Sequence, residues 1–287
     1  MVKQGKVRIV WKSDNGKCVA LVAGDGVSAF DEQLGVVIPN KGKLLTKMSE
    51  KWFTMTGEIV PNAMLATNDK ALFCDFQEEY YVGRTTKMMA LRMLPIEAIV
   101  RGYITGSMWS NYCNGIRKIC DYDIPDGLLE SQKLPEAIYT PTTKAPEGKH
   151  DENITFEQTV SVIEQAGFED AYELAEKVRS YSLLLYRTCS QYAEERGIIL
   201  ADTKFEFGVD DMGILRVADE MCTPDSSRFW SREDYAVGRS QASMDKQIIR
   251  DWIKEAKARG EEHPRVPDDI LELTSKKYEE CYEILFG

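Results

Sequence analysis

The sequence predicts an α+β fold built as two unequal lobes. Its 287 residues lie at the upper limit for one hydrophobic core. Strand-like alternation and turn residues dominate the first ninety residues, whereas long helical stripes and strands are mixed in the remainder. We therefore expect a strand-rich lobe over residues 1–92, a larger α+β lobe over residues 93–287, and a cleft between them.

Composition excludes several classes of protein. Hydrophobic residues make up 43% of the chain and aromatic residues 10%, which is typical of a globular protein with a substantial core. The net charge of −11 argues against a nucleic-acid partner or an anionic membrane surface, because both require a basic face. No apolar run approaches the roughly 20 residues that span a bilayer, and the N-terminus lacks a signal-peptide core, so we expect a cytoplasmic protein.

Cysteine and histidine usage narrows the chemistry further. The seven cysteines are scattered without a CxxC pair, which favours reduced, buried thiols over disulfides or a zinc site. Only two histidines are present, which excludes a histidine-rich metal site.

The first lobe is expected to open with a β-hairpin. Residues 6–12 and 18–22 alternate as strands around an Asp-Asn-Gly turn. Gly5, Lys6 and Arg8 stand at its start, where a glycine and two cations could cover nucleotide phosphates; an ordinary surface hairpin is the alternative. A helix is predicted over about 44–55, and further strands over 71–76 and 80–82.

The second lobe is expected to begin with a strand over residues 96–103. It places Glu97 and Arg101 on one face and runs into Gly106 and Ser107. Arginine offers a bidentate fork and serine a hydroxyl, so this segment could bind a phosphate. A structural Arg101–Glu97 ion pair explains the spacing equally well.

A long irregular region over residues 121–153 is expected to form a substrate-binding loop, because structureless stretches of this length are usually functional or disordered. Thr155 and Gln158 have the spacing of a capping box. The predicted helix that starts at this capping box continues through Val160 and Ile163. The remaining predicted elements are helices over about 169–195, 243–258 and 268–285, strands over 198–207 and 214–220, and a turn over 223–230.

The strand over 198–207 carries the main chemical signal. Asp202, Lys204 and Glu206 alternate on one face, and Phe205 and Phe207 lie on the other. Carboxylates that flank an ammonium could hold a divalent metal and a phosphate, whereas the simpler interpretation is a solvated edge strand.

The strand that returns after it adds two carboxylates. An approximate hairpin register sets Asp219 and Glu220 beside Asp202, and like charges this close require a compensating cation. This cluster favours the metal-site interpretation.

Taken together, the motifs resemble one family, the phosphoribosylaminoimidazole-succinocarboxamide synthases, or SAICAR synthetases, and in particular its longer branch. The resemblance covers nearly the whole chain, with departures at Ile9, Gly26 and Met108. The segments that carry it are Leu94–Glu97 through Arg101 to Ser107, Leu200–Gly208, Ala218–Glu220 and Thr223–Trp230.

The resemblance implies an ATP-dependent ligase of purine biosynthesis with a two-lobed SAICAR synthase-like fold. It would join L-aspartate to 5-amino-1-(5-phosphoribosyl)imidazole-4-carboxylate (the imidazole ribotide), with ATP and Mg²⁺ as cofactors, through an acyl phosphate. The implied roles are metal binding by Asp202, Glu206 and Asp219; phosphoryl transfer near Lys204; nucleotide binding by Gly5, Lys6, Arg8 and Asp219; ribotide binding by Arg101, Ser107, Asp225, Ser227 and Arg228; and closure of the site by Lys144 and Asp151.

Two other classes stay open at this point. A small-molecule kinase would release a phosphorylated product without aspartate, and a non-catalytic nucleotide-binding protein would bind ATP without turnover. The expected partners are small molecules, and the expected assembly is a monomer or a homodimer.

Overall fold

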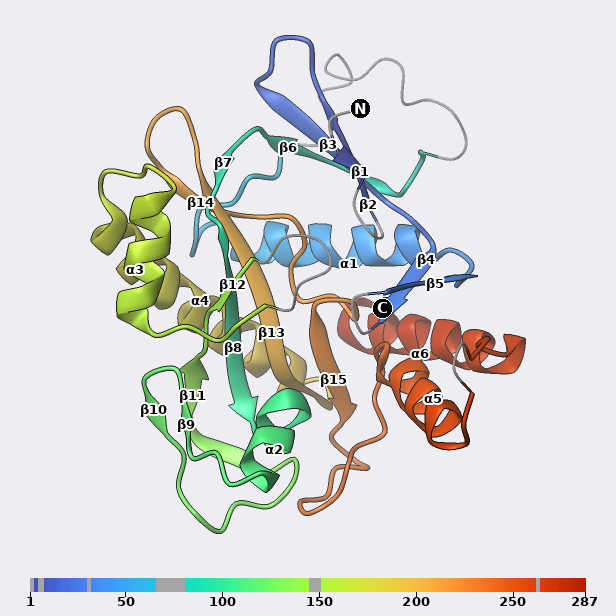
Figure 1. Cartoon of the computed structure of the whole chain (residues 1–287). Coiled ribbons are helices and arrows are strands. Elements are labelled where there is room, and N and C mark those ends of the chain that lie inside the picture. The colour runs from blue at the N-terminus through green and yellow to red at the C-terminus, as the bar shows by residue number, and fades with distance from the viewer. Residues whose placement is uncertain (1–2, 5–7, 30–31, 66–80, 145–150, 262–263) are drawn as a thin grey trace.

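The computed structural model describes residues 3–4, 8–29, 32–65, 81–144, 151–261 and 264–287 (Figure 1). Its N-terminal part holds two antiparallel sheets. The first has the strand order β1-β2-β3-β6, and the second pairs β4 with β5. The bounds are β1 Lys3–Gln4, β2 Arg8–Lys12, β3 Cys18–Ala23, β4 Gly26–Ala29, β5 Glu32–Val37 and β6 Thr85–Met89.

A seven-stranded sheet forms the centre of the molecule, and β13 is its organising strand. Strand β13 (Ile198–Val209) pairs with β8 (Ile96–Tyr103), β14 (Leu215–Ala218), β15 (Ser227–Ser231) and β7 (Arg92–Met93), all antiparallel. On its far side β8 pairs with β11 (Lys133–Tyr139) and β12 (Thr142–Thr143). A separate two-stranded ribbon joins β9 (Lys118–Ile119) to β10 (Tyr122–Asp123).

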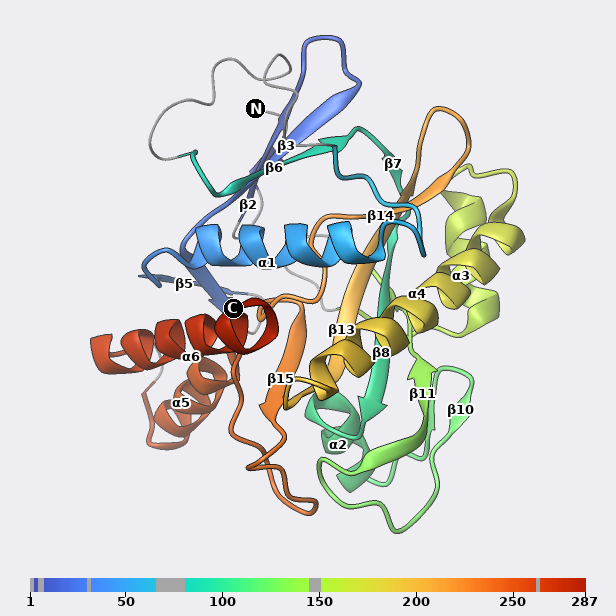
Figure 2. The same ribbon diagram turned by 180° about the vertical axis from the view of Figure 1, so that it is seen from behind.

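Six helices are present in the described residues, and α1, α4 and α6 lie behind the central sheet when it is seen as in Figure 1; the view from behind in Figure 2 shows this helical side. Phe205 and Phe207 point into this helical side and are fully buried, at 0% and 1% exposure. The opposite face of β13 is therefore left for polar side chains. The helix bounds are α1 Lys41–Thr56, α2 Gly106–Cys113, α3 Phe156–Gln165, α4 Ala171–Glu194, α5 Gln247–Ala258 and α6 Asp268–Phe286.

The main core crosses the predicted lobe boundary. Trp52 and Phe53 of α1 pack in the same buried cluster as Leu94, Phe205 and Leu185. A smaller cluster packs Val27 and Ile38 against Ile249, Ile253, Val266 and Leu271 of the C-terminal segment. The division at residue 92 stays a prediction, and these clusters make the contact between its two sides largely apolar.

Most predicted elements are confirmed. The opening hairpin, the strand over 96–103, the strand over 198–207 and the five predicted helices all form, with ends shifted by a few residues. The capping box of Thr155 and Gln158 is complete in both directions. The strand predicted over 71–76 lies outside the described residues.

Four expectations are wrong. Residues 81–82 belong to a turn instead of a strand, and β6 begins only at Thr85. The region over 121–153 is not structureless, because β11 pairs with β8. Residues 227–231 form β15 instead of continuing the turn that Thr223-Pro224-Asp225 favoured. The simpler alternative for residues 198–207, an edge strand, is also wrong, because β13 is a central strand.

Candidate active site

The polar face of β13 carries a chain of ion pairs. Lys204 donates to Glu97 on β8 at 2.5 Å, and its Nζ lies 3.6 Å from Glu206 Oε1. Lys144, which follows β12, pairs with the other oxygen of Glu206. Burial opposes the charged form of Lys204, but Glu206 and Glu97 outweigh it and raise the pKa of Lys204 above its usual value. The ammonium of Lys204 is therefore held charged between two carboxylates.

Asp202 lies between two arginines from the neighbouring strands. The β-sheet register places Asp202 opposite Arg101 of β8 and opposite Arg228 of β15. Arg228 Nη1 pairs with Asp202 Oδ2, and Arg101 Nη1 lies 3.6 Å from the same oxygen. Arg101 also donates from Nε to Thr140 Oγ1 at 3.0 Å. The alternative Arg101–Glu97 pair is therefore wrong, because each partner is engaged elsewhere.

The start of α2 lies against the Arg228 guanidinium. Gly106 has a φ of +57°, and a Cβ built on it would lie 2.8 Å from Arg228 Cζ. A side chain is therefore excluded on two grounds, the left-handed backbone and the contact with the guanidinium. Ser107 follows as an exposed residue in the first turn of α2. The guanidinium of Arg228 thus lies at the start of α2, a helix that the sequence analysis did not predict, and Ser107 lies in the first turn of that helix.

A second carboxylate pair is bound by Arg8 of the N-terminal sheet. Arg8 contacts Asp219 Oδ1 at 2.7 Å and Glu220 Oε2 at 2.5 Å. Asp219 has a φ of 58°, an uncommon conformation for a non-glycine residue that is found at functional sites. Burial opposes the ionisation of Asp219, but Arg8 and Lys204 outweigh it and lower the pKa of Asp219. Gly5 and Lys6 lie outside the described residues.

The register of the β13–β14 hairpin differs from the expected one. Val209 pairs with Leu215 and Glu206 pairs with Ala218, so β14 ends before Asp219 and lies at the Glu206 end of β13. The expected placement of Asp219 and Glu220 beside Asp202 is therefore wrong. The connection between the two strands runs over residues 210–214 and is closed by a hydrogen bond from Asp210 N to the Ile214 carbonyl oxygen.

A single magnesium site with Asp202, Glu206 and Asp219 as ligands does not fit this geometry. Asp202 and Glu206 are four residues apart on one strand, or about 13 Å at 3.3 Å per residue, whereas Mg²⁺ binds oxygen at about 2.1 Å. Among the described residues no group of three metal-binding side chains is assembled. Glu206 and Asp219 fit one ion better than Asp202 does, because Glu206 pairs with Ala218, the residue directly before Asp219.

The other predicted ribotide residues lie on the segment that leads into β15. Ser227 shares a 2.8 Å hydrogen bond with Thr203, and both hydroxyls are buried. Asp225 pairs with Lys41 at 2.8 Å and accepts a 3.1 Å hydrogen bond from Tyr278. Asp151 is an exposed residue whose charge acts on Glu97. The structure thus groups the described candidates around β13, with Asp151 at the margin.

Three residues that contact the predicted site residues were not recognised from the sequence. Glu97 was weighed only as a partner of Arg101, although its place on the same face as Arg101 could have indicated a site role. Lys41 and Tyr278 gave no signal, because they lie at the start of α1 and within α6, far from Asp225 in sequence. Only the fold brings them together.

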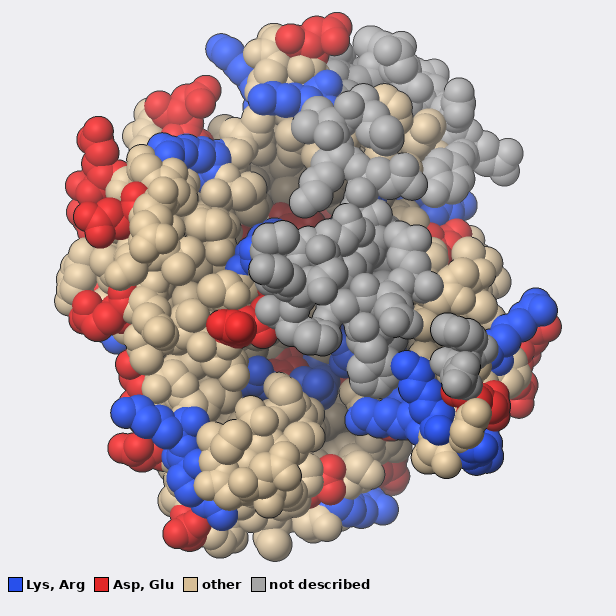
Figure 3. All heavy atoms as spheres, in the orientation of Figure 1, with Lys and Arg blue, Asp and Glu red and all other residues tan. Residues whose placement is uncertain are grey.

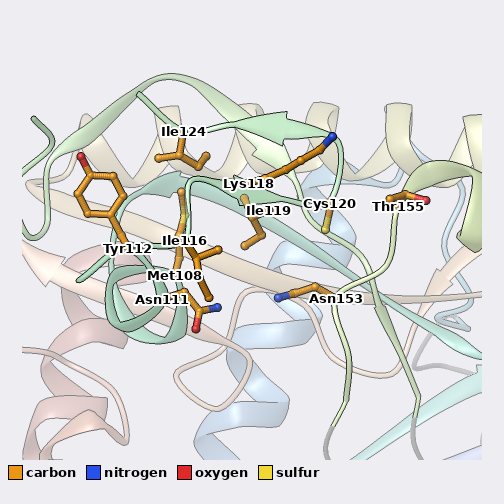
Figure 4. Close-up of a pocket in the computed structure, with 10 residues that line it drawn as sticks. All are labelled: Met108, Asn111, Tyr112, Ile116, Lys118, Ile119, Cys120, Ile124, Asn153 and Thr155. Atoms are coloured by element: carbon orange, nitrogen blue, oxygen red, sulfur yellow. The ribbon is translucent and has the colours of Figure 1, made fainter. Parts of the chain in front are cut away.

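Figure 3 shows acidic and basic side chains deep in a hollow just above α2, on the face seen in Figure 1. A separate cavity of about 260 Å³ lies beside α2, bounded by Met108, Ile119, Cys120 and Asn153 among others (Figure 4). None of the predicted site residues lines that cavity, so the ionic face of β13 is the candidate active site.

These features define a class of protein: an α+β protein that brings two arginines and a lysine–carboxylate chain to one strand. A family model described as SAICAR synthetase matches residues 1–267. The chain therefore belongs to the SAICAR synthetase family, and it is a ligase of purine biosynthesis.

Individual relatives align with this chain over nearly its full length. A phosphoribosylaminoimidazole-succinocarboxamide synthase of Lachnospira eligens is 47% identical, with 100% of this chain and 95% of the relative covered. The protein of the same name from Methylibium petroleiphilum is 42% identical, with 99% and 94% covered.

Solved structures show the same fold. SAICAR synthase from Saccharomyces cerevisiae, solved with SAICAR, has a TM-score of 0.86 and 40% identity, with 100% of this chain and 94% of that chain covered. A SAICAR synthetase solved with ADP has a TM-score of 0.71 at 23% identity, with 100% and 98% covered, so it bears on the fold alone. In the described residues no helix combines the length and apolarity needed to cross a membrane.

Proposed function

We propose that this chain joins L-aspartate to the imidazole ribotide at the expense of ATP, and that the ionic face of β13 lines the active site. The observation that carries the proposal is the division of that face. One end holds Asp202 between two arginines, and the other end holds Lys204 among carboxylates. The first end suits a substrate phosphate and the second suits phosphoryl transfer.

The ribotide phosphate would bind at Arg101, Arg228 and Ser107. Asp202 neutralises one of the two guanidinium charges, so one positive charge remains for the phosphate. The absence of a side chain at Gly106 leaves the Arg228 fork accessible from α2. In this proposal Asp202 orients the two arginines, and this role replaces the metal-binding role expected from the sequence.

The nucleotide phosphates would bind to Arg8, and the same role is proposed for Lys6 and Gly5. Glu206 and Asp219 would hold Mg²⁺, which supplies charge neutralisation for the transferred phosphoryl group when it is bound. Mg²⁺ commonly uses only one or two protein carboxylates together with substrate phosphates, so two carboxylates are sufficient. Arg8 and Lys144 would then exchange part of their pairing with these carboxylates for contacts with the nucleotide.

Lys204 would stabilise the charge that develops during phosphoryl transfer. A carboxylate oxygen of the ribotide attacks the γ-phosphorus of ATP, and ADP leaves. The aspartate amine then attacks the carbonyl carbon of the acyl phosphate, loses a proton, and expels inorganic phosphate. Lys144 and Asp151 would close the site over aspartate. The protein contributes positioning and charge neutralisation, because the substrates themselves provide the nucleophiles and the leaving groups.

The larger organisation is proposed on the same basis. Residues 1–92 would cover ATP, residues 93–287 would carry the ribotide and metal sites, and the cleft would lie between them. We propose a cytoplasmic protein that acts as a monomer or a homodimer.

A three-substrate assay tests the function. Multiple-turnover ADP release should require both the ribotide and aspartate. Multiple-turnover ADP release without aspartate, with a phosphorylated product accumulating, would indicate a kinase, and ATP binding without turnover would indicate a nucleotide-binding protein. Glu206→Ala and Lys204→Ala should each abolish most turnover at saturating Mg²⁺. Near-normal turnover in both variants would contradict the residue assignment.

A further inference from the structure

Lys41 is a buried cation that contacts Asp225, a predicted substrate-binding residue in a distant part of the chain. Its side chain is 1% exposed and lies at the first position of α1. The ammonium lies 2.8 Å from Asp225 Oδ2 and donates to the carbonyl oxygen of Gly26 at 2.9 Å. A buried ammonium is costly to desolvate, so both contacts are needed to keep it charged in this position.

Tyr278 of α6 holds the other oxygen of the same carboxylate. Its hydroxyl donates to Asp225 Oδ1 at 3.1 Å, and the residue is 1% exposed. The two oxygens of Asp225 are thus fixed separately, one by α1 and one by α6. A carboxylate can accept about four hydrogen bonds, so each oxygen still has a lone pair available.

The backbone at Asp225 leads directly into the ribotide site. Ser227 is two residues further on and Arg228 three, and both belong to β15, which pairs with Asp202 and Thr203 of β13. Asp225 therefore lies on the segment that leads into the strand of Arg228, and its carboxylate is fixed by α1 and α6. An ionised carboxylate next to a phosphate site accepts hydrogen bonds from hydroxyl groups, and ribose carries two adjacent hydroxyls.

We propose that Lys41 and Tyr278 are positioning residues for the ribotide: they hold Asp225 ionised and in one orientation so that it accepts the ribose hydroxyls. This inference rests on the proposed function. Neither residue contacts the reacting atoms in this account, so each acts only through Asp225. Asp225 distinguishes a ribosylated substrate from one that lacks the hydroxyls.

The charges that face Asp225 make a pH readout informative. Lys41 on α1, Lys246 before α5 and Arg8 on β2 act on it, as does the Tyr278 hydroxyl on α6. Burial opposes the ionisation of Asp225, and Lys41 followed by Lys246 outweighs it, so the pKa of Asp225 lies well below its usual value. Removal of Lys41 should raise that pKa toward the working pH.

The test compares Lys41→Met and Tyr278→Phe with wild type by steady-state kinetics over pH 5–8. We expect KM for the ribotide to rise about 10- to 100-fold in Lys41→Met, with KM for ATP within about twofold, since loss of a charge-assisted contact costs about 1.5–3 kcal/mol. The acid limb of kcat/KM for the ribotide should move to higher pH. Tyr278→Phe keeps the ion pair, and it should raise ribotide KM several-fold.

Two controls keep the outcomes separate. Lys43→Met makes the same change at an exposed position of the first turn of α1, and it should leave all three KM values unchanged. If Lys41→Met does not fold, Lys41→Met/Asp225→Asn removes both buried charges, and it should show raised ribotide KM without the pH shift. A selective rise in KM for ATP, or unchanged ribotide KM in Tyr278→Phe, would overturn the inference. A wild-type enzyme without aspartate-dependent ADP release would instead overturn the proposed function.

Discussion

The Lys204 ammonium lies 2.5 Å from the Glu97 carboxylate, across the antiparallel pair β13 and β8. Only 12% of the Glu97 side chain is exposed, compared with 31% for Lys204. Burial raises the pKa of Glu97, while Lys204 acts in the opposite direction. The more deeply buried carboxylate therefore fixes the ammonium, and the partly exposed ammonium is left facing the site.

Glu97→Gln should lower kcat because the ammonium loses its fixed partner while keeping Glu206. A misplaced catalytic group costs up to about 100-fold, so we expect a fall of about 10- to 100-fold with KM for the ribotide nearly unchanged. Steady-state kinetics measure this. Glu136→Gln on the exposed side of β11 is the matched control. Equal kcat in both variants would show that Glu97 does not position the Lys204 ammonium.

Asp202→Asn should destabilise the fold. The substitution keeps the shape of the side chain but leaves Arg101, which is 5% exposed, without its carboxylate. Breaking a buried ion pair from one side costs about 3–5 kcal/mol, which urea unfolding at pH 7 can measure. The Mg²⁺ dependence of residual turnover should match that of wild type. A large rise in the Mg²⁺ requirement would restore Asp202 as a metal ligand. Asp211→Asn, in the exposed hairpin turn, should change neither quantity.

Gly106→Ala and Gly115→Ala form a matched pair. Both glycines have positive φ, at +57° and +84°, so alanine costs each about 1–2 kcal/mol of backbone energy. Only Gly106 has the Arg228 guanidinium where the methyl group would lie, whereas Gly115 faces open space. Ribotide KM should rise at least tenfold in Gly106→Ala alone. A similar ribotide KM in both variants would show that ribotide binding does not require the close contact between Gly106 and the Arg228 guanidinium.

Acid should destabilise the protein through Asp225. Its folded-state pKa is lowered below the usual 3.8, so its stabilising contribution is complete above about pH 4 and is lost as pH falls below that value. Urea unfolding at pH 7, 4 and 3 should show this loss in wild type. Lys41→Met/Asp225→Asn, which has neither charge, should lose less free energy of unfolding between pH 4 and pH 3. An equal loss in both proteins would assign the acid sensitivity to other carboxylates.

Local patterns predicted most of the fold. Alternation identified β8 and β13 because burial alternates over residues 96–100 and 203–207, although the rest of each strand is largely buried on both faces. The 3.6-residue period identified α4, whose buried residues include Val178, Leu185 and Cys189. The register of β13 with β14 could not be predicted reliably, because loop length sets it and one hairpin loop can close in several ways.

The candidate site was predicted residue by residue, but its pairing was not. Asp202, Lys204 and Glu206 were identified as one ionic face, whereas the sequence does not show that Asp202 serves two arginines and Lys204 serves Glu97. Arg101 and Glu97 lie on a strand about a hundred residues earlier, and Arg228 lies 26 residues after Asp202. Lys41 shows the same limit, since a lysine at a helix start looks like surface until the fold buries it.

The fate of the ribotide carboxylate oxygens shows directly whether ATP phosphorylates the ribotide carboxylate. With both oxygens labelled with ¹⁸O, the enzyme, ATP, Mg²⁺ and aspartate should yield inorganic phosphate that carries one ¹⁸O, while the other stays in the amide carbonyl of the product. Mass spectrometry of the phosphate reads this result. Phosphate without ¹⁸O, formed while the succinocarboxamide accumulates, would contradict phosphoryl transfer to the carboxylate and the role given to Lys204.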